Sequence, residues 1–218
     1  MQIILLKNPM DVLQEEIPRA IRSKFIPIIN RGYNLANNVI KEIPFLDWDL
    51  GYQHTGYLKN IAVQYAFKKE TENGNLPFES SLVFNSNRSS KHLEMKTGNS
   101  IITVSQVQNH NVIARHAFFR KKLQLSNQLR FNFDTINDNF VTEQPYYILI
   151  THGYGQEAPN FINVGIPDGH SWMTKINLLA EPHLVTARDD NKVKEEEIMP
   201  EQLVGFKKFV KEVVGSEK

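Results

Sequence analysis

The spacing of apolar side chains changes along this chain of 218 residues, and each change predicts a different kind of element. In the first 44 residues apolar side chains recur at helical spacing, Leu13 and Ile17 among them. Pro18 and Pro27 exclude one straight helix, because proline lacks an N–H and its ring clashes with the preceding turn. We therefore expect two or three helical pieces, the last opened by Pro27 and ending before Pro44.

The next segment has a period of two. From Tyr57 to Phe67 apolar side chains occupy odd positions, whereas Asn60 and Gln64 occupy even ones. This alternation is typical of a strand with one buried face, and we predict a half-buried strand there. Turn-forming residues follow at 70–77, and residues 81–85 predict a second strand.

Residues 92–105 predict a β-hairpin of defined register. Gly98-Asn99 supplies a two-residue turn, and glycine in the first position suits a type II′ turn. The predicted pairs are Thr97 with Ser100, Met95 with Ile102, and Leu93 with Val104. A shift of one residue would mix this apolar face with the polar face that carries His92, Glu94 and Lys96.

Residues 114–127 suit a helix, 146–150 and 161–166 predict strands, and residues 203–213 carry an apolar helical stripe. Such a stripe favours docking of the last helix on the rest of the protein. Taken together, the order indicates an α+β fold with a mainly antiparallel sheet of hairpin-linked strands, packed by N-terminal, central and C-terminal helices. We expect a single domain over 1–180, then an acidic linker and a C-terminal amphipathic helix over 181–218.

Composition and the N-terminal sequence narrow the classes of function. The absence of cysteine excludes a disulfide scaffold, a thiolate zinc site and a cysteine nucleophile. The N-terminal apolar run, residues 3–6, is short and Lys7 follows it, so a secretion signal is not expected. No stretch approaches the roughly 20 apolar residues of a membrane span. The cytoplasm is the default location.

A weak metal hypothesis rests on histidines near predicted strand ends. His152, Asp168 and His170 could gather imidazole and carboxylate ligands for zinc or manganese if their two loops lie at the same end of the sheet. Their spacing follows no known ligand pattern, and loop histidines are usually solvated. We therefore expect no resident metal or cofactor.

Charge is unevenly distributed, although the whole chain carries only +1. Residues 85–131 contain eight Lys and Arg residues against the single acid Glu94, which gives +7 and leaves −6 for the remainder. A polar strand face beside a basic helix could track a phosphate backbone. Phe118 or Phe119 could stack on bases if exposed, but we expect both side chains in the core. The same surface would suit an acidic protein, or its charges could pair with the acidic segment 181–201.

The main hypothesis is therefore an intracellular binding or regulatory protein, without a catalytic centre, whose basic strand–helix surface contacts nucleic acid or an acidic protein partner. The residues expected to make these contacts are Arg88, Lys91, His92, Lys96, Arg115, Arg120, Lys121 and Lys122.

Glu94 and Lys96 support an alternative function. Metal-dependent nucleases of the restriction-enzyme type use Glu-x-Lys on a strand, where the period of two puts the carboxylate that binds Mg²⁺ or Mn²⁺ and the ammonium that orients water on one face. A second acid would come from Glu79, Asp47 or Asp49. Glu-x-Lys is also frequent by chance on exposed strands, so the motif alone does not establish this family.

A third interpretation is a protein-only inhibitor or immunity-type partner. Its aromatic anchor would be the loop around Trp48 or the region of Trp172, because large aromatic side chains often dominate protein interfaces. Retention of nucleic acid, metal-dependent cleavage, or capture of a single protein would separate the three interpretations.

Overall fold

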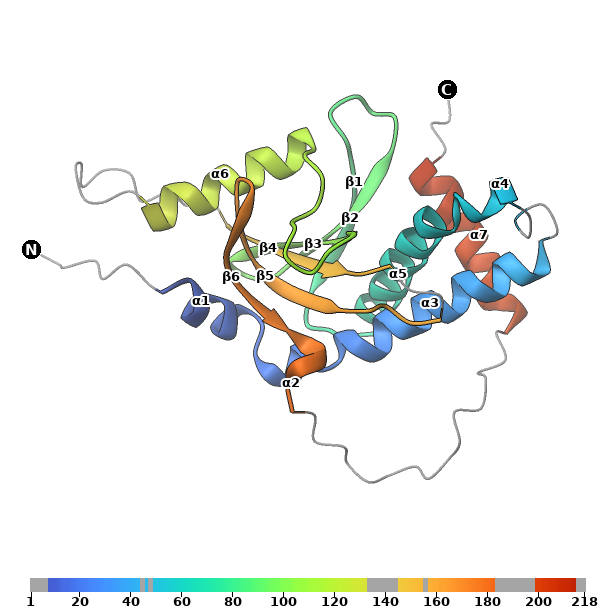
Figure 1. Ribbon diagram of the computed structural model, residues 1–218, viewed down its shortest axis with the longest axis horizontal. Coiled ribbons are helices and arrows are strands. Elements are labelled where there is room, and N and C mark those ends of the chain that lie inside the picture. The colour runs from blue at the N-terminus through green and yellow to red at the C-terminus, as the bar shows by residue number, and fades with distance from the viewer. Residues whose placement is uncertain are drawn as a thin grey trace, which may run out of the picture.

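The computed structural model describes residues 8–43, 46, 49–132, 145–154, 157–182 and 199–214 (Figure 1). In chain order the elements are α1 (Pro9–Glu16), α2 (Arg19–Arg22), α3 (Phe25–Glu42), α4 (Asp49–Tyr52), α5 (Thr55–Glu72), β1 (Glu79–Phe84), β2 (Lys91–Lys96), β3 (Ser100–Gln106), α6 (Phe118–Asn132), β4 (Tyr146–His152), β5 (Ile162–Asp168), β6 (Ser171–Asn177), a 3-10 turn (Leu178–Ala180) and α7 (Pro200–Val214).

The six strands form one sheet in the order β1-β2-β3-β4-β5-β6. Neighbouring strands are antiparallel except β3 and β4, which are parallel and have α6 between them in the chain. A parallel pair requires a crossover connection, and α6 lies on that connection. The expected α+β class with a mainly antiparallel sheet is confirmed. Strand β6 was missed by the sequence analysis, which ended the sheet at β5.

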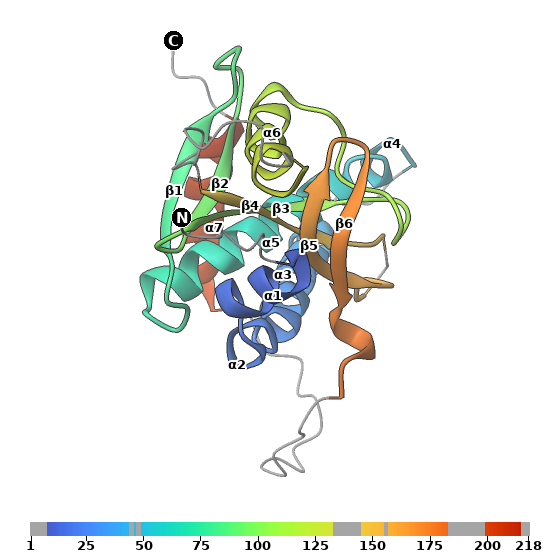
Figure 2. The same ribbon diagram turned by 90° about the vertical axis from the view of Figure 1, so that its left-hand side faces the viewer.

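Helices cover both faces of the sheet (Figures 1 and 2). On one face Ile148 and Ile150 of β4 belong to a core shared with α1, α3 and α5. On the other face Tyr147 and Leu149 pack with Leu123 of α6. Strand β4 is therefore apolar at consecutive positions, as expected for a strand that is buried on both sides.

Residues 57–67 are helical, so the strand predicted there is wrong. Helix α5 packs against α3, α7 and three strands, and its buried positions include consecutive residues from Ile61 to Tyr65. A helix buried on several sides has no single apolar stripe, and the period that would identify it is lost. The crossing with α3 is close, because a Cβ on Gly32 would lie 2.7 Å from the Cα of Val63.

The N-terminal pieces are helical as predicted, and Pro27 is the third residue of α3 rather than its first. At the other end of the chain, the stripe on α7 is buried against α3 and α5. Tyr65 of α5 contacts the rings of Phe206 and Phe209, with centroid distances of 5.5 and 5.4 Å. Within the described part of the chain, no helix is both long and apolar enough to cross a membrane.

The predicted β2–β3 hairpin has the expected register. Met95 pairs with Ile102, and the N–H of Thr97 donates to the carbonyl of Ser100 at 2.9 Å. The turn type is different from the prediction, because Gly98 lacks the positive φ that a type II′ turn requires. The Thr97 hydroxyl oxygen instead holds the turn by accepting from the N–H groups of residues 99 and 100.

Candidate functional site

Strands β2 and β3 separate at the end of the hairpin away from its turn. The paired residues are Glu94 with Thr103, Met95 with Ile102, and Lys96 with Ile101. The predicted pair of Leu93 with Val104 is absent from this ladder. Beyond the pair of Glu94 with Thr103, β2 remains paired with β1 and β3 remains paired with β4. The sheet therefore forks between β2 and β3. We call this gap the β2–β3 fork.

Two amide side chains of α5 occupy the fork and satisfy its backbone. The Gln64 Oε1 atom accepts from the N–H of Leu93 at 3.0 Å, and the Asn60 Oδ1 atom accepts from the N–H of Gln106 at 3.0 Å. Buried backbone donors without partners are costly, so these two bonds replace part of what the missing strand pairing would supply. Helix α5 thereby holds the fork open.

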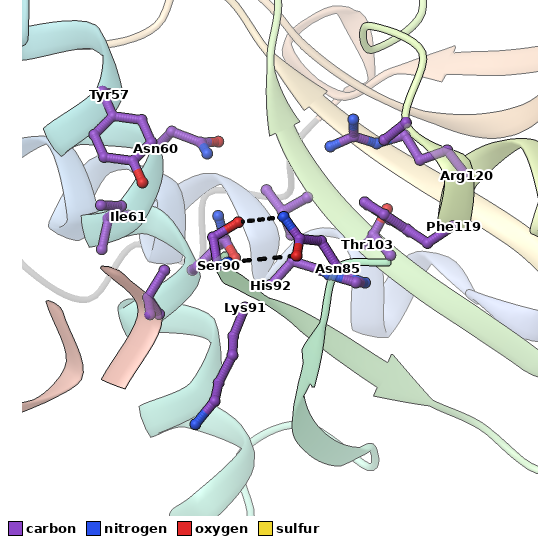
Figure 3. Close-up of a pocket in the computed structure, with 14 residues that line it drawn as sticks. Tyr57, Asn60, Ile61, Asn85, Ser90, Lys91, His92, Thr103, Phe119 and Arg120 are labelled. Atoms are coloured by element: carbon purple, nitrogen blue, oxygen red, sulfur yellow. Dashed lines mark hydrogen bonds between the residues drawn. The ribbon is translucent and has the colours of Figure 1, made fainter. Parts of the chain in front are cut away.

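A pocket of about 220 Å³ lies in the β2–β3 fork, and we call it the fork pocket (Figure 3). Residues of β2 and β3, among them His92 and Thr103, form part of its lining. Tyr57 and Asn60 of α5 line one side, and Arg120 of α6 extends toward them from the other (Figure 3). Val213 of α7 and residues of the β1–β2 loop complete the lining.

The charge of the fork pocket is positive. Lys91 and Arg120 line it, and none of the described lining residues is Asp or Glu. The Arg120 guanidinium donates from Nη1 to the carbonyl of Arg115 at 2.9 Å and from Nη2 to the Ser105 hydroxyl at 2.6 Å, while its buried Nε has no partner. No carboxylate in the described ranges forms an ion pair with it. Burial lowers the pKa of Arg120, and the neighbouring Tyr147 opposes this shift.

His92 lies between an aromatic ring and a carboxylate. Its ring stacks on Phe119 with centroids 3.7 Å apart, and its Nε2 lies 3.1 Å from Oε1 of Glu94. Its buried Nδ1 has no hydrogen-bond partner. Glu94 is itself buried, and it pairs with His92 rather than with Lys96.

The eight predicted contact residues fall into three groups. Lys91, His92 and Arg120 line the fork pocket. Both overall views place the β1–β2 loop beside the first turn of α6 (Figures 1 and 2). The loop carries the exposed Arg88, the segment before α6 carries the exposed Arg115, and α6 itself carries the exposed Lys121 and Lys122. Lys96 is exposed at the opposite end of β2, next to the hairpin turn. We call the first two groups together the basic face.

Three exposed aromatic side chains border the basic face, and they were not predicted as a group from the sequence. Phe118 is 71% exposed at the first position of α6, so its predicted place in the core is wrong. Tyr57 of α5 and Phe84 of β1 are also exposed. The Lys91 Nζ atom lies 4.6 Å from the centre of the Phe84 ring. The sequence signal available for Phe118 was its position two residues before the basic run that starts at Arg120.

The three weak metal candidates do not come together. His152 pairs with Ile162 at the start of β5, whereas Asp168 is the last residue of β5 and His170 follows it in the next turn. His152 is buried against Tyr33, and His170 instead contacts His116 at 3.0 Å. Among the residues that the structure describes, no group of three or more His, Asp or Glu side chains could hold a metal ion.

The structure brings one possible second acid near the Glu-x-Lys pair. Glu79 is directly opposite Lys96 in the β1–β2 ladder, and Glu94 is two positions along the same strand, so all three share one face of the sheet. Asp47 lies outside the described residues, and Asp49 is the first residue of the short helix α4.

The proposed aromatic anchors of a protein-only partner gain no structural support. Trp48 lies outside the described residues. Trp172 is half-buried and packs with Tyr147 and Leu149 on the α6 side of the sheet. It is therefore part of that core and does not project as an exposed anchor.

Comparisons of this chain with protein-family models, curated proteins and solved structures find no significant match.

Proposed function

We propose that this protein binds single-stranded nucleic acid through the basic face. The observation that carries this proposal is the combination of Arg and Lys side chains with exposed aromatic rings at one end of the sheet. Phosphates attract the cations, and bases stack on exposed aromatic rings without regard to sequence. Phe118, Tyr57 and Phe84 are available for such stacking.

The cations of the basic face are not neutralised by internal pairing. Arg88, Arg115, Lys121 and Lys122 form no ion pair within the described ranges. The start of the acidic segment 181–201 has another partner, because Glu181 forms a salt bridge with Arg22 at 2.6 Å. An acidic protein could use the same charges, but the exposed rings favour nucleic acid over a carboxylate-rich surface.

The first test measures binding of labelled single-stranded DNA and RNA of about 15 nucleotides by fluorescence anisotropy at several salt concentrations. We expect affinity to fall linearly with salt on logarithmic axes, because each phosphate contact releases counterions. Replacing Lys121 and Lys122 by Glu should weaken binding and reduce the slope by about 1 to 1.5. The matched control is Lys207→Glu with Lys208→Glu, an adjacent exposed pair on α7 outside the basic face.

Binding that is absent at low salt, or that both double variants weaken equally, would refute the proposal. Retention of an acidic protein by a column carrying this chain, together with no oligonucleotide binding, would assign the basic face to a protein partner instead.

A second test concerns stacking. Phe118→Ala should weaken binding of single strands by about 1–3 kcal/mol, the usual cost of losing one base–aromatic contact, and should affect duplexes much less. Leu125→Ala is the control, because Leu125 is exposed on the same helix but offers no ring. If both substitutions have the same effect on single strands, Phe118 does not stack on a base.

The alternative of a metal-dependent nuclease is favoured by the shared face of Glu79, Glu94 and Lys96. In the binding assay, oligonucleotide cleavage that requires Mg²⁺ or Mn²⁺ and disappears in Lys96→Ala would support this alternative. Cleavage that survives the substitution would place the reaction elsewhere.

A further inference from the structure

We infer that the fork pocket binds a phosphate monoester, the group found at the end of a nucleic-acid strand and on a free nucleotide. This inference deepens the proposed function and rests on it. The basic face would hold the body of a strand, and the fork pocket would hold its terminal phosphate.

The fork pocket contains positive charge that no carboxylate among its described lining residues matches. Arg120 and Lys91 bring two positive charges, and no carboxylate lines the described pocket. A cation that is removed from water without a counter-ion is unfavourable, and a bound anion relieves that cost. A phosphate monoester carries about −1.5 to −2 charges near neutral pH, so it can pair with the Arg120 guanidinium inside the pocket and is also attracted by the nearby Lys91.

The fork pocket also offers hydrogen-bond donors to a phosphate. Because Asn60 uses its Oδ1 to accept from the N–H of Gln106, its amide NH₂ remains as a donor. Figure 3 shows Asn60 and Arg120 extending into the pocket from opposite sides, while Lys91 extends away toward its rim. Phosphate oxygens accept hydrogen bonds, and bonds with a charged partner are roughly twice as strong as neutral ones.

The size and surroundings of the pocket favour the end of a strand over its interior. Strands β2 and β3 contribute to the lining of the pocket, and residues of α5 and α6 line it from opposite sides (Figure 3). Its volume of about 220 Å³ is below the roughly 300 Å³ at which sites for small organic ligands begin. A phosphodiester within a strand would have to enter with nucleotides on both sides, whereas a terminal monoester enters with one. The attached nucleoside would then lie near Tyr57, whose exposed ring lines the pocket.

The test compares oligonucleotides of identical sequence that end in a 5′-phosphate, a 3′-phosphate or only hydroxyl groups. In competition anisotropy, we expect one phosphorylated form to bind the wild-type protein at least about tenfold more tightly than the hydroxyl form, as expected for charge-assisted hydrogen bonds. A nucleoside 5′-monophosphate that competes equally well would identify a free nucleotide as the ligand. Failure of the mononucleotide to compete would identify a strand end.

The key variant is Asn60→Asp. It is isosteric, keeps an oxygen that can accept from the N–H of Gln106, and replaces the donor that faces the pocket with a negative charge. The matched control is Asn109→Asp, since Asn109 also accepts from a backbone N–H through Oδ1 but does not line the pocket. We expect Asn60→Asp to abolish the preference for a terminal phosphate and Asn109→Asp to retain it.

Equal binding of phosphorylated and hydroxyl oligonucleotides to the wild-type protein would overturn the inference and leave the proposed function intact. A preference that persists in Asn60→Asp would also overturn it. Absence of binding by every oligonucleotide would instead refute the proposed function.

Discussion

Lowering the pH from 7 to 4 is expected to destabilise the protein by about 3 kcal/mol through His152 alone. Complete burial lowers the pKa of His152 from 6.5 to about 3. The unfolded chain therefore binds a proton near pH 6.5 that the folded protein does not bind until about pH 3. The stability from this residue is full above pH 6.5 and falls by about 1.4 kcal/mol per pH unit below it.

The surroundings of His152 explain why no partner stabilises its charged form. The Tyr33 hydroxyl donates to the carbonyl of Gly153 and lies 2.9 Å from His152 Nδ1, so it accepts from that nitrogen. Burial raises the pKa of Tyr33 to about 12, so the hydroxyl stays neutral and supplies no counter-charge. The second ring nitrogen, Nε2, is buried without a partner.

Urea unfolding between pH 7 and 4 measures this effect. His152→Asn retains an N–H donor at the position of Nδ1 but cannot titrate, so we expect lower stability at pH 7 and a flatter acid dependence. The exposed residue His54 provides the control, because His54→Asn should retain the full slope. Equal slopes for wild type and His152→Asn would show that His152 does not control acid stability.

Phe206→Ala is expected to lower the free energy of unfolding by about 3–5 kcal/mol. The ring is 2% exposed and packs against Tyr65, so its removal leaves a cavity between α7 and α5. If α7 can undock while the rest of the protein stays folded, the stability lost through substitutions on α7 cannot exceed its docking free energy. We therefore expect Phe206→Ala with Phe209→Ala to cost less than the two single substitutions added together.

Urea denaturation gives the stability, and hydrogen exchange shows whether the amides of α7 open separately from the sheet. The control is Val204→Ala on the same helix, since Val204 is 67% exposed and its truncation should change stability by less than about 0.5 kcal/mol. Strictly additive losses of stability, together with α7 amides that are as protected from exchange as those of β4, would show that α7 does not undock separately.

The β2–β3 hairpin and α7 were predicted correctly because the apolar side chains of each element lie mainly on one face. Apolar and polar side chains mostly alternate along the β2–β3 hairpin, although several of the polar ones are also buried, and the apolar stripe on α7 has the helical period. Helix α5 is packed on several sides, and its sequence therefore resembled a strand. The class of the fold was still correct, because one misassigned element left the strand-rich middle of the chain intact.

The candidate site was predicted only in part. Local charge identified Lys91, His92 and Arg120, since all three lie within one basic segment. The fork itself depends on Asn60 and Gln64, whose bonds replace strand pairing over separations of 46 and 29 residues. No pattern along the sequence indicates that a side chain will replace strand pairing. An amide that bonds to a distant backbone group has the same sequence signal as any polar surface residue.

The fork also has a thermodynamic consequence. In the described sheet, three residue pairs join β2 to β3, fewer than join any other two neighbouring strands, so this seam is the weakest one. A ligand in the fork pocket lies against residues of both strands, such as His92 of β2 and Thr103 of β3, so it bridges the same seam and its binding energy adds to folding stability. At a hundred times its Kd, such a ligand raises stability by about 2.7 kcal/mol. A rise in melting temperature can therefore reveal a ligand of the fork pocket even when neither a reaction nor a partner protein has been identified.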